Sequence, residues 1–359
     1  MNPGFWQGKR VLVTGHTGFK GGWLALWLQQ LGANVIGVSL DPPTKPNFYR
    51  QARVADGMLS LRADIRDGEA LKKIFAEHHP VVLFHLAAQS LVRHSYREPA
   101  ETYETNVMGT LHVLEAMRAA NTTRAAVMVT SDKCYENREW LWGYRENDAL
   151  GGFDPYSSSK GAAELLIASY RNSYFPQERY QEHKTAIASA RAGNVIGGGD
   201  WAEDRLVPDI IRAFQQGAAV HIRNPDAVRP WQHVLEPLAG YLMLAERLHT
   251  EGMQYAEAWN FGPLEEDARP VKWIADEMAA LWGDDAAWLQ DSGDHPHEAR
   301  ALKLDCSKAH ARLEWWPRWP LQAALKKIIE WHKAESANKD MRKLCLKQIE
   351  QYCTPITRT

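Results

Sequence analysis

The sequence is poor in cysteine and has no long apolar run. Its 359 residues include four cysteines, which are not spaced as metal or redox ligands are. This count excludes a disulfide-stapled secreted domain, fits a reducing cytoplasm and predicts no metal site. No stretch of about 18 apolar residues is present, and no charged-then-apolar leader precedes Lys9. We therefore expect a cytoplasmic protein that does not bind a membrane.

The charge is nearly balanced. The sequence has 42 lysines and arginines and 44 aspartates and glutamates, which gives a formal net charge of -2 at pH 7. No global field therefore attracts nucleic acid or an anionic surface. With an ordinary hydrophobic fraction of 45%, the chain is expected to bury a large core and to act on a small molecule.

Short apolar runs alternate with longer helical patterns in the first half of the chain. This order predicts an α/β fold, a Rossmann-type doubly wound parallel sheet with a smaller mixed α/β substrate lobe. Apolar residues recur at helical spacing over 22–31 and 100–120, and Pro155 stands where a proline opens a helix that runs toward Tyr174. Six runs have the composition of strands: 10–14, 34–39, 59–63, 81–86, 126–130 and 185–190.

The pattern changes after Arg191, where glycine, proline and tryptophan interrupt shorter elements. We expect a dinucleotide-binding domain over 1–192, with returns near 232–262, and a substrate lobe over 193–335. The remaining residues, 336–359, form a polar tail with the pattern of a lysine-bearing helix, to which the sequence assigns no role.

A glycine-rich loop follows the first predicted strand directly. Glycines at this spacing let the backbone turn sharply and approach a pyrophosphate, while the next helix presents free N–H groups to the negative charge. The strand-loop-helix context favours a dinucleotide site over a tight packing turn. The residues of this predicted loop are Gly15, His16, Thr17, Gly18, Phe19, Lys20 and Gly21.

The end of the second predicted strand carries Ser39, where an acidic residue would bind the adenosine ribose of NAD. Asp41 lies two residues further on and is able to take this role, which favours NAD. Ser39 together with Lys20 would instead tolerate a ribose phosphate, so NADP remains the alternative. Further residues at strand ends complete the predicted cofactor site: Asp64, Ile65, Leu86, Ala87, Ala88 and Gln89.

Tyr156 and Lys160 stand four residues apart at a predicted helix start and therefore share one face. A lysine ammonium near a phenol stabilises the phenolate, which takes a hydroxyl proton as hydride leaves the same carbon. Ser131, Asp132 and Lys133 follow the fifth predicted strand. The serine hydroxyl is suited to bind the reacting oxygen. The carboxyl and the amine are useful where a ketone acidifies a neighbouring C–H and water is expelled; a surface charge pair is their alternative.

These motifs resemble the extended short-chain dehydrogenase/reductase family, specifically its nucleotide-sugar 4,6-dehydratases. The resemblance extends from about Lys9 to about Trp331 and rests on the glycine loop and on residues 86–89, 131–133, 156–160, 191–194 and 229–231. Most such dehydratases carry glutamate where Lys133 stands. The Ser-Asp-Lys run and the glycine loop look most like the CDP-glucose branch, a hydro-lyase branch whose product leads to dideoxy sugars of bacterial surface polysaccharide such as O-antigen.

The resemblance implies a three-stage reaction with NAD. Tyr156 removes the sugar 4-hydroxyl proton while hydride leaves C4, and Lys160 holds the phenolate and the cofactor ribose. Asp132 protonates the departing C6 hydroxyl, and hydride returns to C6. A protonated lysine cannot accept the C5 proton, so Lys133 is either neutral or positions a water or another base. The sequence leaves both possibilities open.

A nucleotide-sugar substrate carries a diphosphate, for which arginine forks are suited, although each arginine has a surface charge as its alternative. The resemblance adds contacts to the phosphate region and to the nucleoside, and CDP rests on the resemblance alone. The predicted substrate residues are Gln89, Asn194, Arg205, Arg229, Trp231, His297 and Arg300.

Other functions share part of this pattern. A UDP-sugar 4-epimerase would have the loop and the Tyr/Lys pair but would not need Asp132. A dTDP-glucose or GDP-mannose dehydratase would be expected to carry glutamate at position 133. A non-catalytic dinucleotide sensor would have lost Tyr156 or Lys160, and both are present. The two long predicted helices are expected to pair with their copies, as in family members, in a homodimer or homotetramer.

Overall fold

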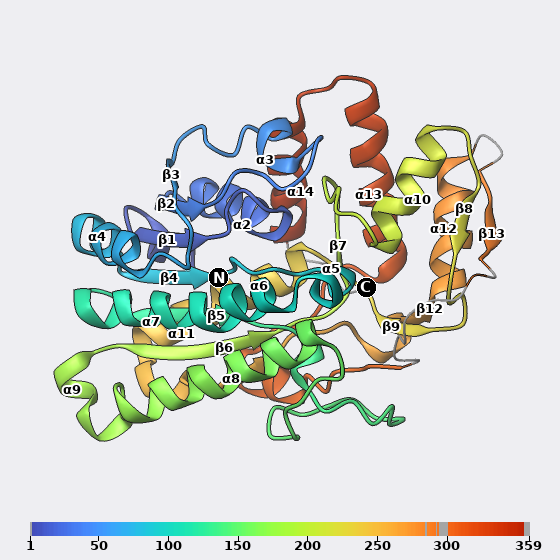
Figure 1. Cartoon of the computed structure of the whole chain (residues 1–359). Helices are drawn as coiled ribbons and strands as arrows, with labels where there is room; N and C mark the ends of the chain where they lie inside the picture. The colour runs from blue at the N-terminus through green and yellow to red at the C-terminus, as the bar shows by residue number, and fades with distance from the viewer. Residues whose placement is uncertain (1, 284–285, 292, 294–300, 355–359) are drawn as a thin grey trace.

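A parallel sheet forms the centre of the computed structural model, which describes residues 2–283, 286–291, 293 and 301–354. The order of its strands is β11-β6-β5-β4-β1-β2-β3 (Figure 1). The strands are β1 (Arg10–Thr14), β2 (Asn34–Ser39), β3 (Leu59–Arg62), β4 (Val82–His85), β5 (Ala125–Val129), β6 (Ala186–Arg191) and β11 (Ala258–Asn260). Because β1 pairs with both β2 and β4, the strand order reverses there and opens a crevice at the carboxyl ends.

The predicted fold class is confirmed. The six predicted strands agree with the observed ones to within one residue at each end. The seventh strand, β11, was not predicted because its three residues are too few to show a pattern, and pairing with β6 defines it.

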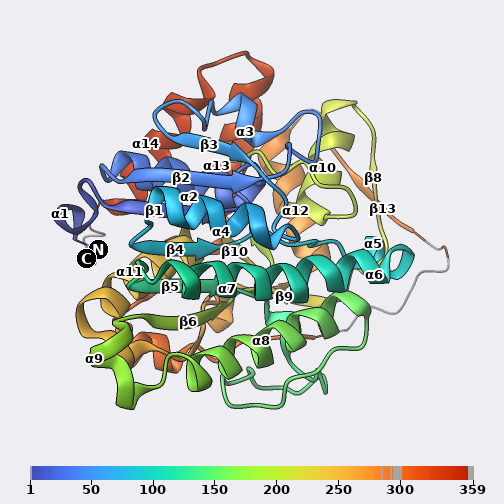
Figure 2. The same ribbon diagram turned by 60° about the vertical axis from the view of Figure 1, so that its left-hand side comes forward.

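Helices cover both faces of the sheet (Figure 2). Successive side chains of a strand point to opposite faces. Leu12 accordingly packs in one cluster with α4 (Gly68–His78), α7 (Gly109–Ala120) and α8 (Pro155–Ser173). Val11 and Val13 pack in the other cluster, to which α2 (Phe19–Gln30), α11 (Leu235–Glu251) and α13 (Leu321–Ser336) contribute. Burial on both faces explains why most of the strands are mainly apolar, whereas the partly exposed edge strand β3 alternates leucine with serine and arginine.

The predicted helix over 100–120 is interrupted. It consists of α6 (Pro99–Tyr103), a π-helical turn at Glu104–Met108, and α7. Asn106 lies in this turn and is buried; its amide donates to the Gln89 carbonyl at 3.0 Å and to Ser159 Oγ at 2.9 Å. The turn therefore ties the segment after β4 to the first turns of α8, close to the predicted catalytic pair.

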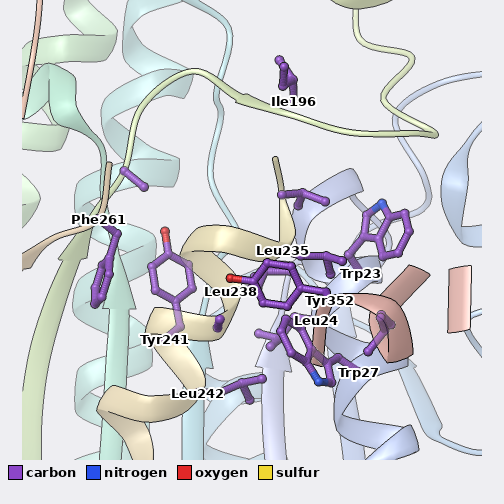
Figure 3. Packing of buried hydrophobic residues seen from close by; sticks show 14 of the residues in the cluster. Trp23, Leu24, Trp27, Ile196, Leu235, Leu238, Tyr241, Leu242, Phe261 and Tyr352 are labelled. Atoms are coloured by element: carbon purple, nitrogen blue, oxygen red, sulfur yellow. The ribbon is translucent and has the colours of Figure 1, made fainter. Parts of the chain in front are cut away.

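The C-terminal tail is part of the core. Its helix α14 (Met341–Cys353) packs on α2 and α13. Figure 3 shows Tyr352 among Leu24, Trp27 and Leu238, and the Trp331 indole N–H donates to Cys345 Sγ at 3.2 Å. The tail is thus amphipathic, and its buried face closes the sheet face that carries α2.

A smaller lobe lies beside the carboxyl ends of the strands (Figure 1). It contains α10 (Leu206–Gln215), α12 (Val271–Trp282), the pair β8 (Val220–Ile222) and β13 (Trp288–Gln290), and the pair β9 (Val228–Pro230) and β12 (Ala268–Pro270). Among the residues that the structure describes, no helix combines the length and apolar character needed to cross a bilayer.

Candidate active site

A cavity of about 910 Å³ lies between the strand ends and the smaller lobe. Of the predicted site residues within the described chain, all except His16 line it. His297 and Arg300 lie outside the described residues. The structure therefore brings the predicted cofactor loop, catalytic residues and substrate arginines to one space.

His16 points away from this cavity. Its ring is fully buried and hydrogen-bonds Ser60 Oγ at 2.7 Å. Burial, together with the nearby charge of Arg62, lowers the pKa of His16 to about 4, so the ring is neutral. A Cβ at Gly37 would overlap the ring. The side chain of His16 thus fills space beside β2, and only its backbone belongs to the cofactor loop.

The glycine loop forms a tight cradle. Gly15 has φ +79°, and a Cβ there would lie 2.8 Å from the Ala87 nitrogen. A Cβ at Gly21 would overlap the Gly15 carbonyl. Gly18 caps α2 without a side chain that would occupy its first N–H groups. These groups and the helix dipole are therefore available to a dinucleotide diphosphate, and the loop fits one.

The end of β2 has a more polar surrounding than the sequence indicated. Ser39 Oγ hydrogen-bonds Thr17 Oγ1 at 2.7 Å. Asp41 accepts a hydrogen bond from Arg62 Nε at 2.9 Å while its side chain stays 84% exposed. Lys20 lies instead near the catalytic residues, so the pairing of Ser39 with Lys20 that would have tolerated NADP is not formed.

Three polar residues meet at the end of β5. The Ser131 hydroxyl donates to Asp132 Oδ1 at 3.0 Å and accepts the Lys133 N–H at 3.2 Å. Asp132 is 2% exposed, and its Oδ2 has no hydrogen-bond partner among the described residues. Burial raises the pKa of Asp132, although Lys133, Ser131 and Arg229 oppose this rise. A carboxyl with a raised pKa keeps its proton to higher pH and is suited to act as a general acid.

Tyr156 and Lys160 project from the first turns of α8. The Asp154 side chain accepts the Ser157 N–H at 2.9 Å and caps this helix, and Ser95 Oγ accepts the Tyr156 N–H at 3.1 Å. Burial raises the pKa of Tyr156 to about 12, although a hydrogen bond with Ser131 opposes the shift. Burial also lowers the pKa of Lys160 to about 8. Proton loss from the phenol therefore requires the lysine charge close by, which the four-residue spacing supplies.

The predicted substrate residues lie around the wide part of the cavity. Arg205 donates to Asp200 Oδ2 at 2.9 Å and to Ser90 Oγ at 2.9 Å, so its guanidinium is held in place. Trp231 is fixed by a hydrogen bond from its indole to the Arg269 carbonyl at 3.0 Å. The side chain of Gln89 is used within the protein, since its amide donates to Leu91 O and Thr102 Oγ1. Asn194 and Arg229 also line the cavity.

The sequence interpretation missed Gly193, Arg93, Arg223 and Asp204. A Cβ at Gly193 would overlap the Asp132 carboxyl, so only glycine leaves that carboxyl its place. Asp204 pairs with Arg93 at 3.2 Å and with Arg223 at 3.8 Å, and all three line the cavity. No spacing motif connects residues so far apart in the chain. Of these four residues, only Gly193 could have been found from the sequence, because it lies within residues 191–194, one of the segments on which the family resemblance rests.

The fold and the site define an enzyme of the short-chain dehydrogenase/reductase type, in which a dinucleotide cradle adjoins a Ser/Tyr/Lys centre. The family model described as GDP-mannose 4,6 dehydratase matches residues 12–328. The chain therefore belongs to this family of nucleotide-sugar 4,6-dehydratases.

Individual relatives agree with this assignment. The chain is 56% identical over 358 residues to the CDP-glucose 4,6-dehydratase of Salmonella typhimurium, with 100% of both chains covered. The structure of MoeE5 in complex with UDP-glucose and NAD is 25% identical, with a TM-score of 0.76 over 91% of this chain and 99% of that one. The UDP-glucose 4-epimerase of Thermotoga maritima shares the fold at 24% identity, with a TM-score of 0.77 over 91% and 99% of the chains.

Proposed function

We propose that this protein catalyses the NAD-dependent dehydration of CDP-glucose to CDP-4-dehydro-6-deoxyglucose and water. The observation that carries the proposal is Asp132, a buried carboxyl with a raised pKa that lies beside Ser131 and lines the same cavity as Tyr156. Expulsion of water needs such an acid, whereas 4-epimerisation does not. The relation to the Salmonella typhimurium enzyme at 56% identity supports CDP-glucose over dTDP-glucose and GDP-mannose.

The first stage oxidises C4. The glycine loop would hold NAD, which would supply a hydride acceptor for C4 and, once reduced, the hydride donor for C6. Tyr156 takes the 4-hydroxyl proton, Ser131 holds the same oxygen, and the Lys160 charge stabilises the phenolate from which this step begins. The resulting 4-ketone makes the C5 hydrogen acidic.

The second stage expels water. A base removes the C5 proton, Asp132 gives its own proton to the C6 hydroxyl, and the C6–O bond breaks to release water and leave a C5=C6 double bond. The base returns the proton to C5 when hydride reaches C6. Tyr156 has by then gained one proton and Asp132 has lost one, so a proton transfer between them restores both groups. Ser131 provides the path, because its hydroxyl donates to Asp132 and also acts on the pKa of the neighbouring Tyr156 phenol.

The substrate diphosphate is assigned to the arginines of the smaller lobe. Arg205 and Arg229 line the cavity together with Asn194 and Trp231. Bidentate guanidinium groups suit a diphosphate, and the hydrogen bonds of Arg205 to Asp200 and Ser90 pre-organise it. His297 and Arg300 remain predictions for the nucleoside, as does the division into a cofactor domain and a substrate lobe.

We also propose a cytoplasmic homodimer or homotetramer that serves the synthesis of deoxysugars for O-antigen. All four cysteines are free thiols, as expected in a reducing compartment. Apolar side chains are exposed on the helices predicted to pair: Met108 in the π-helical turn (44%) and Leu165 on α8 (62%). Light scattering on the purified protein measures its molar mass in solution, and the mass of a monomer would contradict the proposed homodimer or homotetramer.

The substrate is tested by mass spectrometry. The purified protein is incubated with NAD and, separately, with CDP-glucose, dTDP-glucose, UDP-glucose and GDP-mannose. We expect loss of one water from CDP-glucose alone, and no loss with the Tyr156→Phe variant. Epimerisation without water loss, or accumulation of reduced cofactor with an oxidised sugar, would contradict the dehydratase assignment.

A further inference from the structure

Lys20 belongs to the glycine loop in sequence but lies with the catalytic residues in space. It is the second residue of α2, and it lines the same cavity as Ser131, Asp132, Tyr156 and Lys160. Its Nζ lies 5.8 Å from the centre of the Tyr241 ring. Figure 3 shows the Tyr241 hydroxyl pointing to the side on which Ile196 lies, and Ile196 also lines the cavity. Lys20 therefore reaches the reaction space.

The charges around Lys20 disfavour its protonated form. Burial, then the cations Arg205 and Lys160, lower the pKa of Lys20 to about 7, and only the Asp132 carboxyl opposes this. The lysine also stands in the first turn of α2, where the helix dipole is unfavourable to a cation. Within the described chain no carboxylate forms an ion pair with it. Unlike the guanidinium of Arg205, this amine is able to lose its proton at neutral pH.

Lys133 has a different surrounding. Its backbone N–H is bound by Ser131 Oγ, and its ammonium attracts the neighbouring carboxylate and thereby lowers the pKa of Asp132 against the effect of burial. The cavity thus holds one lysine directly beside the acid and a second lysine, Lys20, whose charged neighbours are mainly cations.

We propose that Lys20 is the catalytic base that removes the C5 proton; this inference rests on the proposed dehydratase function. The neutral Nζ lone pair takes the C5 hydrogen as a proton, and the C–H electron pair forms the C4=C5 bond of an enolate. As the C4 carbonyl re-forms, these electrons move to C5=C6, and the C6–O bond breaks onto the proton from Asp132. Lys20 later returns its proton to C5 and ends neutral, as it began.

The test measures C5 exchange, which needs no redox step. The 4-keto-6-deoxy product, made with the unsubstituted enzyme, is incubated at saturation in D₂O with each variant, and deuterium at C5 is followed by NMR. We expect Lys20→Met to exchange at least about 100-fold more slowly, the lower end of the effect of a general base. Lys20→Arg should be equally slow, because arginine keeps the charge but does not accept a proton. Lys72→Met, at an exposed lysine of α4, is the matched control and should exchange normally.

The outcomes separate the base from the function. Exchange by Lys20→Met within about threefold of the unsubstituted rate overturns the proposal, as does rescue by Lys20→Arg, which would mean that only charge matters. Loss of exchange in Lys133→Met with retention in Lys20→Met also overturns it. If the unsubstituted enzyme does not dehydrate CDP-glucose, the proposed function itself fails. If the unsubstituted enzyme dehydrates CDP-glucose but does not exchange added product, the same variants are compared with C5-deuterated CDP-glucose as the substrate. The isotope effect on the rate of dehydration should then be larger in Lys20→Met than in the unsubstituted enzyme.

Discussion

Glu164 and Arg191 form an ion pair in the core, with Oε2 and Nη2 2.8 Å apart and side chains 2% and 3% exposed. Glu164 also accepts hydrogen bonds from Thr130 Oγ1 at 2.5 Å and Ser189 Oγ at 2.7 Å. Burial raises the pKa of Glu164, but Arg191 and these hydrogen bonds outweigh it and hold the carboxyl ionised. Since Glu164 follows Lys160 by one helical turn, the pair fixes the catalytic face of α8 against the ends of β5 and β6.

Glu164→Gln is expected to destabilise the protein severely. The substitution keeps the shape but leaves the Arg191 charge buried without its counter-ion, so the free energy of unfolding should fall by about 3–5 kcal/mol. Urea denaturation measures this change. Glu69→Gln is the matched control, because Glu69 pairs with Lys72 at the surface and its loss should leave the denaturation midpoint unchanged. Equal midpoints for the two variants would show that the buried pair adds nothing to stability.

Gly193→Ala should separate water loss from C4 oxidation. The added methyl group overlaps the Asp132 carboxyl and must displace it, while Tyr156 and Lys160 project from a different element. We expect dehydration of CDP-glucose to slow by at least about 100-fold, as for loss of a general acid, with reduced cofactor still formed. Mass spectrometry and absorbance of the reduced cofactor measure the two stages. Gly68→Ala is the control, because its Cβ would meet His112 only at 3.4 Å. Normal water loss by Gly193→Ala would contradict the role of Asp132.

Activity should decrease above about pH 8, the value to which burial lowers the pKa of Lys160. The charged form stabilises the phenolate, and this form disappears as the pH rises through the pKa. Glu164 and Cys134 raise the pKa of Lys160 against the effect of burial. Lys20 is a further titratable group that interacts with Lys160, since the charge of Lys160 lowers the pKa of Lys20. Lys160→Arg keeps its charge at all these pH values, so the alkaline decrease of kcat should move upward by about one pH unit or more. An unmoved decrease in this variant would assign it to another group.

The parts of the fold that sequence could predict are those with a local pattern. Five of the six longer strands are mainly apolar and buried, while β3 alternates between leucine and polar residues. The glycine-rich loop is also a local pattern, because its glycines are needed for a sharp turn, and it indicates the cofactor site. β11 lacks such a pattern, because its pairing with β6 defines it. The π-helical turn lacks one too, and it is accompanied by contacts of Asn106 with residues far away in the chain. The strand pairs of the smaller lobe are similarly set by tertiary contacts.

The site residues also divide into those that a local sequence pattern reveals and those that only tertiary contacts bring together. Tyr156 and Lys160 were found because their spacing along one helix implies their chemistry, and Ser131 was found because it directly follows a predicted strand. The pairs Glu164 with Arg191 and Gly193 with Asp132 join residues that are far apart in the chain, so no local spacing reveals them. Lys20 shows a further limit, since a motif fixes the backbone of a loop but not the direction in which each side chain points.

The tail was predicted as a polar helix, and the apolar stripe along it was overlooked. Met341, Cys345, Ile349 and Tyr352 recur at helical spacing and are buried. The Tyr352 hydroxyl donates to Glu236 at 2.6 Å in the core, beside the backbone N–H groups of Arg318 and Trp319.

Tyr352→Phe should lower the free energy of unfolding by about 1–3 kcal/mol, because it removes a hydrogen-bond donor from a buried acidic group. Urea denaturation measures the loss, with Tyr174→Phe as the control at a half-exposed ring. Since α14 packs on α2, whose first turn forms the cofactor cradle, the same variant should also bind NAD more weakly. If Tyr352→Phe matched the control in both measurements, α14 would be a passive cover and would not support the site.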